Sequence, residues 1–362
     1  MAPRPYIGGQ AVLEGVMMRA PRSFAVVVRR RDGSLQVRER AMTEGPRGMA
    51  RWPLVRGVAS LVESLRLGNE ALRFSAEQME RDLAAAATGV LGALGLSLFA
   101  MASADDGAPV DSGGSGRGKA GMTLMLVLAI GFFIALPQGA AAGVNRLFHL
   151  GLEVQSAPFQ AITGAFKLAI VVGYLLAIRR VPDIRRVFQY HGAEHKTIST
   201  YEAGEALTVD HARAKTTMHP RCGTTFLVMV ALVSILVFTA IGAALPRIHT
   251  GSAFLDNVAF FAEKLPFLPV LVAFTFELQR LFARHCTTGP LRALLWPGFL
   301  VQKITTAEPD DDQLEVALAS LRVTLFRQEQ GHAYESDADV AFPSYAALLA
   351  ADRLRAASAS AA

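Results

Sequence analysis

Residues Thr225 to Leu245 read TFLVMVALVSILVFTAIGAAL, an apolar stretch that carries no charged side chain. A helix needs about 20 apolar residues to cross the hydrocarbon core of a bilayer, and this stretch has that length. The whole chain shares this character, because 52% of its 362 residues are hydrophobic and its mean hydropathy is +0.32. An ordinary soluble domain has a lower apolar fraction. The sequence therefore predicts a mainly α-helical, polytopic membrane protein.

Several other apolar blocks have a similar length. We expect full membrane spans at 83–103, 121–144, 225–245 and 265–283. A further apolar run covers 159–178, although Lys167 interrupts it. Four arginines follow this run within Arg179 to Arg186, and a full crossing would place them outside, against the positive-inside rule. We therefore favour four spans with a re-entrant or interfacial run at 159–178, and five spans are the alternative.

The residues before the first span are expected to form a small α+β unit at 1–82. Alternate positions from Phe24 to Val28 are apolar, and the two-residue turn signal Asp32-Gly33 follows. This pattern predicts a β-hairpin over Ser23 to Arg40. From Pro53 to Glu80 the apolar residues recur at helical spacing, which predicts a helix.

Polar segments separate and follow the two membrane regions at 83–178 and 225–283. The first of these segments covers 179–224, and the second is a tail at 284–362. Within the tail, Asp310 to Asp312 suit the positive end of a helix dipole. Apolar residues at helical spacing follow, which predicts an amphipathic helix over 310–326 that packs on another part of the protein.

The N-terminal unit is basic. From Met1 to Asp82 it contains 14 arginines and no lysine against 9 acidic residues. Beside membrane spans, such an excess indicates a cytoplasmic segment, and the favoured topology places both termini in the cytoplasm. We expect no nucleic-acid partner, because no nucleic-acid-binding signature accompanies the charge. The expected partners are the lipid bilayer and an unidentified membrane-associated substrate or protein, and the sequence allows an oligomer.

The polar segment contains the sequence Tyr190-His191-Gly192-Ala193-Glu194-His195-Lys196. Positions i and i+4 of a helix lie on one face, so that His191 and His195 can converge on one metal ion. The order H-x-x-E-H is that of inverted zinc hydrolases, in which a glutamate can act on a metal-activated water. The sequence thus predicts both histidines as ligands of a divalent metal, with zinc expected, and Glu194 as the general base.

A second motif supplies further candidate ligands. His219 and Cys222 are three residues apart and stand directly before the span at 225–245. Four of the chain's eight histidines fall between His191 and His219. We therefore predict His219, Cys222 or both as ligands. Four protein ligands would make a closed and usually structural site, whereas three ligands and a water would make a site of the catalytic kind.

Less specific interpretations compete for the same residues. The imidazoles could bond backbone carbonyl groups or lipid phosphates in the headgroup layer. Lys196 and Arg221 are predicted to stabilise developing negative charge in catalysis, and with Lys215 they could instead bind an anion. Gln10 and Glu14 lie in a glycine-rich stretch and would serve either the active site or a tight turn.

Four separated motifs occur in the order found in one family. They are Ile7 to Arg19 (IGGQAVLEGVMMR), Tyr190 to Thr197, His219 to Thr224 (HPRCGT) and Thr305 to Asp311 (TTAEPDD). From Tyr6 to Phe326 the chain resembles the YqhQ-like family, a group of bacterial membrane proteins of unassigned function that are labelled metal-dependent enzymes. The resemblance implies a multi-pass protein of the bacterial plasma membrane and a metal site at the histidine cluster. It implies no particular reaction.

Two functions follow from these predictions. The first is a membrane-bound, metal-dependent hydrolase that acts on a membrane-associated substrate at the cytoplasmic face, with Glu194 as the base. The second is a non-catalytic membrane scaffold or assembly factor in which the metal is structural. A transporter is a third hypothesis, which depends only on Glu277 and Lys167 within apolar runs.

Overall fold

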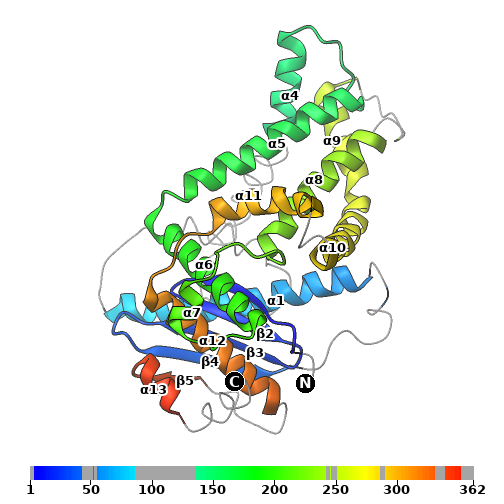
Figure 1. Cartoon of the computed structure of the whole chain (residues 1–362). Helices are drawn as coiled ribbons and strands as arrows, with labels where there is room; N and C mark the ends of the chain where they lie inside the picture. The colour runs from blue at the N-terminus through cyan, green and yellow to red at the C-terminus, as the bar shows by residue number, and fades with distance from the viewer. Residues whose placement is uncertain are drawn as a thin grey trace.

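The computed structural model in Figure 1 describes residues 4–42, 52, 55–85, 136–241, 245, 251–285, 290–330 and 339–351. These residues form two layers. A β-sheet covered by helices lies in the lower part of the view, and long apolar helices lie above it. The helix α6 (Pro182–Ala203) lies at the level where the two layers meet.

The sheet is an antiparallel meander with the strand order β1-β2-β3-β4-β5. The strands are β1 (Gly8–Val12), β2 (Gly15–Ala20), β3 (Ser23–Arg29), β4 (Leu35–Ala41) and β5 (Val340–Phe342). The predicted hairpin is β3 with β4, whereas β1 and β2 come from the glycine-rich stretch in which the sequence predicted no strand. β5 comes from the far end of the chain, and its Phe342 pairs with Leu35 of β4.

The turn between β3 and β4 is wider than the two-residue turn that Asp32-Gly33 indicates. Five residues, 30–34, connect the last paired positions of the strands. Gly33 adopts a φ of +86°, and the carboxylate of Asp32 accepts a hydrogen bond from the backbone N–H of Ser34 at 2.9 Å. The aspartate side chain thus stabilises a longer turn, which the dipeptide alone does not reveal.

Helices cover both faces of the sheet. On one face, α1 (Val55–Ala85) packs the buried Phe74 against β2 and β3. On the other face, α12 (Asp311–Gln330) packs the buried Leu318 against the same strands. Because β3 is covered on both sides, all but its last residue are buried, and successive apolar residues serve opposite faces.

α12 is the helix that was predicted over 310–326, but its burial is not limited to one apolar stripe. The polar Ser320, Thr324 and Arg327 are buried as well, because α12 lies between the sheet and α6. The hydroxyl of Ser23 in β3 donates to the carbonyl of Thr324 at 2.8 Å. Together with β5, this contact joins the predicted N-terminal unit and the predicted tail in one sheet domain.

α6 begins at Pro182 and lies against β1 and α12. Every residue from Tyr190 to Ile198 is buried. The helix ends at Gly204, whose φ of +75° permits the left-handed cap and whose backbone N–H bonds carbonyl groups of the last turn. α7 (Val209–Arg213) and α13 (Tyr345–Ala350) complete this layer.

The second layer consists of apolar helices. They are α4 (Leu136–Leu147), α5 (Ala157–Ile178), α8 (Gly223–Ile241), α9 (Ala253–Lys264), η4 (Leu265–Phe267), α10 (Leu268–His285), η5 (Pro290–Leu295) and α11 (Trp296–Thr305). Among the described residues, three helical segments are long and apolar enough to cross a membrane, namely Ala157–Ile178, Gly223–Ala240 and Val258–Phe282. Little of their surface is covered by protein, which suits helices that contact lipid.

Two of the three segments coincide with the spans predicted at 225–245 and 265–283. The third is the run at 159–178, which forms one unbroken helix despite Lys167 and therefore shows no break of the kind that a re-entrant segment needs. Apart from its first three residues, the span predicted at 83–103 lies outside the described residues, and so does 121–135 of the span predicted at 121–144. The number of spans therefore stays a prediction.

α5 and α8 approach each other at a glycine. A Cβ on Gly164 would lie 2.5 Å from Cγ2 of Ile235 on α8, whereas Gly173 on the same helix faces open space. Gly164→Ala is expected to lower the free energy of unfolding by about 1–3 kcal/mol, the usual cost of overpacking. Gly173→Ala is the matched control and should be neutral or stabilising, because alanine favours a helix. Unfolding of the solubilised variants with SDS would measure both effects, and equal effects would contradict this packing.

Candidate metal centre

α6 brings its two histidines together on one face. His191 and His195 are one helical turn apart, and their ring centroids lie 4.4 Å from each other. Gly192 lets the helix pack closely at this point, because a Cβ there would lie 2.2 Å from the carbonyl oxygen of Ala307. A glycine in a helix is less stable than an alanine by about 1 kcal/mol. At position 192 only glycine allows α6 to approach the backbone of Ala307 this closely.

Cys222 completes a cluster of three candidate ligands. It stands directly before the first residue of α8, and its Sγ lies 3.2 Å from Nε2 of His191. The ligand atoms of His191, His195 and Cys222 all lie within 4.8 Å of one another, and all three residues are buried. Cys222 is a free thiol. One sulfur and two imidazole nitrogens form a donor set that suits zinc.

Backbone carbonyl groups orient both imidazoles. Nδ1 of His191 lies 2.9 Å from the carbonyl oxygen of Thr305, and Nδ1 of His195 lies 2.5 Å from that of Thr217. Because a carbonyl only accepts, each Nδ1 carries a proton, which leaves Nε2 of each ring as the nitrogen that can ligate a metal. Nε2 of His195 is buried without a hydrogen-bond partner in the described part of the chain. A metal ion would satisfy it, so the residues present fit such a group.

The thiol and the imidazoles change each other's protonation. Burial works to raise the pKa of Cys222, but the adjacent His191 and His195 lower it well below its usual value. Burial also works to lower the pKa of His191, yet the charge and hydrogen bond of the Cys222 sulfur raise it to about 9. The geometry therefore favours a thiolate, which is the form of cysteine that ligates metals.

Glu194 lies beside this cluster and packs over the first strand of the sheet. A Cβ on Gly9 would lie 2.7 Å from Oε1 of Glu194, so the absence of a side chain at Gly9 makes room for the carboxyl group. Its Oε2 is buried and has no hydrogen-bond partner among the described residues. Burial raises the pKa of Glu194 to about 8, although the charge of His191 opposes the shift. A carboxyl group with a pKa near neutrality is suited to accept and release protons.

His219 lies next to the cluster but does not join it. Its ring centroid is 5.7 Å from that of His195, and its Nε2 faces a carboxylate oxygen of Glu202 at 3.3 Å. Its Nδ1 accepts a hydrogen bond from the backbone N–H of Arg221 at 3.4 Å, and burial lowers its pKa to about 4. Both ring nitrogens are thus engaged elsewhere. Of the two ligands left open by the sequence, the structure brings Cys222 to the histidine pair.

The two cations that were predicted to assist catalysis have other partners. Lys196 is buried, donates to a backbone carbonyl of α7 at 2.9 Å and forms an ion pair with Glu308. Arg221 forms an ion pair with Glu202, and its guanidinium lies 5.0 Å from the ring centroid of Tyr6. These contacts connect the surroundings of the cluster with α7, the loop before α12 and the N-terminal segment. A catalytic role for either cation stays a prediction.

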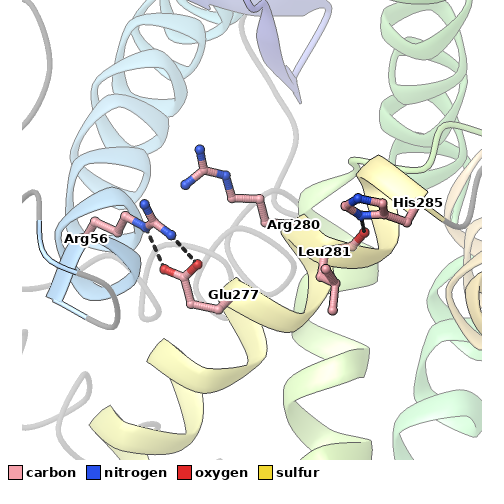
Figure 2. A pocket seen from close by; sticks show the side chains of 5 residues that line it. All are labelled: Arg56, Glu277, Arg280, Leu281 and His285. Carbon is pink, nitrogen blue, oxygen red and sulfur yellow. Dashed lines mark hydrogen bonds and ion pairs between the residues drawn. The ribbon is translucent and has the colours of Figure 1, made fainter.

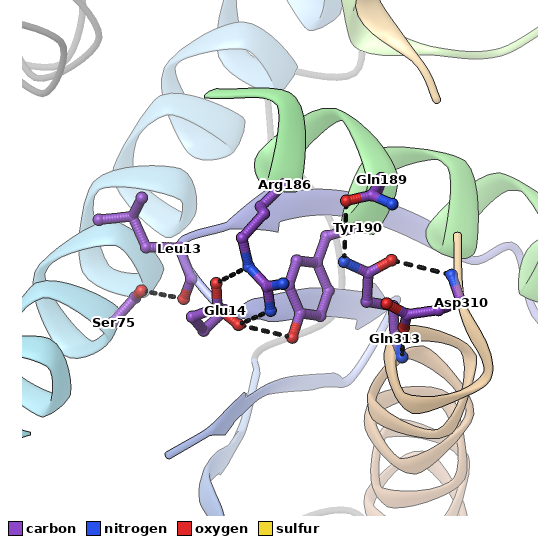
Figure 3. A network of polar contacts seen from close by, with 8 residues as sticks. All are labelled: Leu13, Glu14, Ser75, Arg186, Gln189, Tyr190, Asp310 and Gln313. Atoms are coloured by element: carbon purple, nitrogen blue, oxygen red, sulfur yellow. Dashed lines mark hydrogen bonds and ion pairs between the residues drawn. The ribbon is translucent and has the colours of Figure 1, made fainter. Parts of the chain in front are cut away.

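Glu14 lies in a polar network with residues from the N-terminal half of α6 (Figure 3). It occupies the tight turn between β1 and β2 with a φ of +51°. Its carboxylate accepts two hydrogen bonds from Arg186, at 2.5 and 2.6 Å, and one from the hydroxyl of Tyr190 at 3.1 Å. These contacts agree with the tight-turn interpretation of Glu14 and fix the β1–β2 turn against α6.

The same network extends to the start of α12. Asp310 and Gln313 exchange hydrogen bonds between side chain and backbone N–H, at 3.0 Å each, and so form a reciprocal helix cap. The amide of Gln313 also lies 3.4 Å from Oε1 of Gln189 on α6, as Figure 3 shows. Gln10 is not part of this network, and its side chain packs on Gly68 of α1. The glycine-rich motif therefore serves close packing around the cluster.

Sequence reasoning missed the groups that hold the ligands. The backbone carbonyl groups of Thr217 and Thr305 could not be predicted as partners of the histidines, because every residue has a carbonyl group. Gln302 on α11 is buried, accepts from the backbone N–H of His219 at 2.8 Å and donates to its carbonyl at 2.7 Å. It thus fixes the turn that presents Cys222. The available signal was the motif beginning at Thr305, which follows Gln302 by about one helical turn.

The fold and the cluster define a class: a protein with membrane-compatible apolar helices, a covered antiparallel sheet and a buried His–His–Cys cluster between them. The chain belongs to the family described as "Protein of unknown function (DUF1385)", which matches residues 52–327. It is also similar to the uncharacterized protein YqhQ of Bacillus subtilis (strain 168), with 29% identity over 329 residues that cover 89% of this chain and 92% of that protein. No solved structure matches. The family resemblance is thus confirmed, and it brings no known reaction.

Removal of the cluster ligands is expected to abolish metal binding. Purified His191→Ala/His195→Ala and Cys222→Ala variants should contain almost no zinc, because two ligands or fewer hold an ion weakly. His219→Ala is the matched control and should keep the metal, since its ring nitrogens face other partners. Elemental mass spectrometry would measure the content. Equal metal in the wild type and the double variant would remove the metal hypothesis.

Glu14→Gln tests whether the carboxylate near α6 is structural. The ion pair is partly exposed, with 49% of the Arg186 side chain and 23% of the Glu14 side chain accessible. We expect a loss of about 1 kcal/mol or less in the free energy of unfolding, as for other partly exposed pairs. Metal content should stay unchanged, and a variant that folds normally but binds no metal would show that Glu14 belongs to the site.

Proposed function

We propose that this protein is a membrane-bound, metal-dependent hydrolase. The observation that carries the proposal is a buried set of three ligands beside a buried carboxyl oxygen of Glu194 that has no partner in the described structure. Three protein ligands leave one position of a tetrahedral ion open, and an open position is typical of catalytic zinc sites. The H-x-x-E-H order on α6 supports the same interpretation.

Glu194 would act as the general base. A divalent cation at the cluster, with zinc expected, would lower the pKa of a water molecule in the open position. Glu194 would accept the proton of this water and later deliver it to the leaving group. The buried setting that raises its pKa to about 8 allows it to hold the proton between these steps. The carbonyl groups of Thr217 and Thr305 would keep both imidazoles in the tautomer that binds metal.

The substrate is proposed to be membrane-associated. Cys222 directly precedes α8, so the cluster lies at one end of a helix that is apolar enough to cross a bilayer. Gln279 of α10 donates to the carbonyl of Cys222 at 3.4 Å, which brings a second apolar helix to the same level. An acyl or phosphoryl group at headgroup depth would reach this level.

The topology supports four spans over five. α1, α6 and α12 belong to one sheet domain, because α1 and α12 pack on the sheet and α6 packs on β1. The chain must therefore cross the bilayer an even number of times between α1 and α6, and again between α6 and α12. The arginine excess of residues 1–82 favours the cytoplasmic side of a bacterial plasma membrane for this domain.

A membrane scaffold with a structural metal is the second candidate. The burial of the cluster favours this scaffold function, since His195 is 1% exposed and Cys222 is 6% exposed. A metal there would join α6 of the sheet domain to the foot of α8. Glu194 would then be the fourth ligand, and the closed site would hold no water. The two functions therefore differ in the number of protein ligands.

Transport receives less support from the contacts of Glu277. Its carboxylate accepts hydrogen bonds from Arg56 of α1, at 2.6 and 2.5 Å. A carboxylate in a bidentate pair with a helix of the sheet domain is not an isolated charge along a transport path. The transport hypothesis then depends on Lys167 alone.

Glu194→Gln separates the hydrolase from the scaffold. The hydrolase proposal expects this variant to keep its metal and to lose activity by about 100-fold or more, the usual effect of removing a general base. Purified protein would be incubated with extracted bacterial membrane lipids, and mass spectrometry would follow the loss of one lipid class and the appearance of its hydrolysis product. Glu205→Gln is the matched control, because that carboxylate pairs with Lys215 instead, and should change neither property.

X-ray absorption at the zinc edge gives an independent measurement. The hydrolase proposal expects two nitrogen ligands, one sulfur and one water oxygen in the wild type, with the same set in Glu194→Gln. Loss of metal from Glu194→Gln, or a wild-type site with four protein ligands, would contradict the proposed mechanism and favour the scaffold.

A further inference from the structure

A second cluster of charged side chains lies between α1 and α10, away from the three metal ligands. Arg56, Glu277, Arg280, Leu281 and His285 line a pocket there (Figure 2). Arg56 comes from the first turn of α1, and the others come from the last three turns of α10. The pocket therefore lies where an apolar helix meets the sheet domain.

The charges in this pocket do not cancel. Glu277 is held by Arg56 through two hydrogen bonds, which satisfies the carboxylate. Arg280 is exposed and has no hydrogen-bond or ion-pair partner among the described residues. Figure 2 shows its guanidinium above the Arg56–Glu277 pair, with no contact drawn to it. Nδ1 of His285 faces the carbonyl oxygen of Leu281 at 3.2 Å, on the other side of the pocket. One full positive charge is therefore left over.

The pocket lies at the level where the headgroups of a membrane are expected. Arg280 lies within the apolar segment Val258–Phe282, two residues before its end. Its neighbour Gln279 contacts the backbone of Cys222 at the foot of α8. Trp52 and Trp296 stand exposed, and exposed tryptophans are typical of the headgroup layer.

We infer that this pocket binds the phosphate of an anionic phospholipid, with Arg280 as the main contact. A guanidinium binds a phosphate through two parallel hydrogen bonds. The exposed Leu281 would lie along the upper acyl chain. The Arg56–Glu277 pair would form the polar floor. This inference does not depend on the metal, since none of the pocket residues is a metal ligand.

Trp52 provides a built-in reporter for the test. Its carbonyl accepts the backbone N–H of Arg56 at 3.0 Å, so it lies one turn before the pocket. The chain has two tryptophans, and Trp296→Phe leaves Trp52 as the single fluorophore. Delipidated protein in neutral detergent would be titrated with short-chain phosphatidylglycerol, short-chain phosphatidylcholine or inorganic phosphate. We expect a saturable change of Trp52 emission with phosphatidylglycerol at concentrations where the other two ligands have little effect.

Arg280→Gln should raise the phosphatidylglycerol concentration for half-saturation by about tenfold or more, because a charge-assisted hydrogen bond is lost. Arg280→Lys should recover part of the affinity, since it keeps the charge but not the paired geometry. Arg31→Gln removes an exposed arginine at the β3–β4 turn and should leave binding unchanged. Metal content and thermal unfolding of each variant would verify that the fold is intact, which separates this test from that of the hydrolase.

Three results would overturn the inference. The first is equal binding by wild type and Arg280→Gln. The second is an equal response to phosphatidylcholine, which would show that the pocket does not recognise the anionic headgroup. The third is an equal response to inorganic phosphate, which would assign the pocket to a free anion and not to a lipid.

Discussion

The structure depends on the burial of polar side chains along α6. From Tyr190 to Ile198 the helix is buried throughout, and this stretch includes two imidazoles, a carboxyl group and an ammonium group. Each such group costs free energy unless it finds a partner. The partners of His191, of Nδ1 of His195 and of Lys196 come from the turn before α8 and from the link between α11 and α12. The pairing of these buried side chains of α6 therefore fixes how the sheet domain packs against the apolar helices.

The sheet domain is assembled from both ends of the described chain. β1 to β4 come from its beginning, whereas α12 and β5 come from its end, and the apolar helices lie between them in sequence. Bonds such as that from Ser23 to Thr324 span about 300 residues, so ordering this domain carries a loop-closure cost, although this cost grows only slowly with loop length. Burial of β3 on both faces provides the offsetting hydrophobic gain. The apolar helices are thus an insertion within one domain, which constrains their topology.

The cluster of candidate metal ligands and the arginine pocket lie at the same level of the molecule. The ligand cluster is at the foot of α8, and the arginine pocket is at the foot of α10, with Gln279 joining the two helix ends. Polar groups collect here because the hydrocarbon core excludes them, and because the sheet domain offers the partners that lipid cannot. If both proposals hold, the protein would bind a metal and an anionic headgroup at the same level, as a membrane-associated substrate would require.

The sequence by itself determined the features that depend on local pattern. The hydrophobic blocks predicted two of the apolar segments, and the alternation of apolar residues predicted the β3–β4 hairpin. The spacing of His191 and His195 predicted that both lie on one face of a helix. It left open whether His219 or Cys222 faces that pair, and it gave no sign that Glu14 would bind Arg186. Those outcomes were decided by tertiary structure, because they join segments far apart in the chain. Which side chain turns inward depends on the partners that packing brings within hydrogen-bond distance, and no local pattern encodes that geometry.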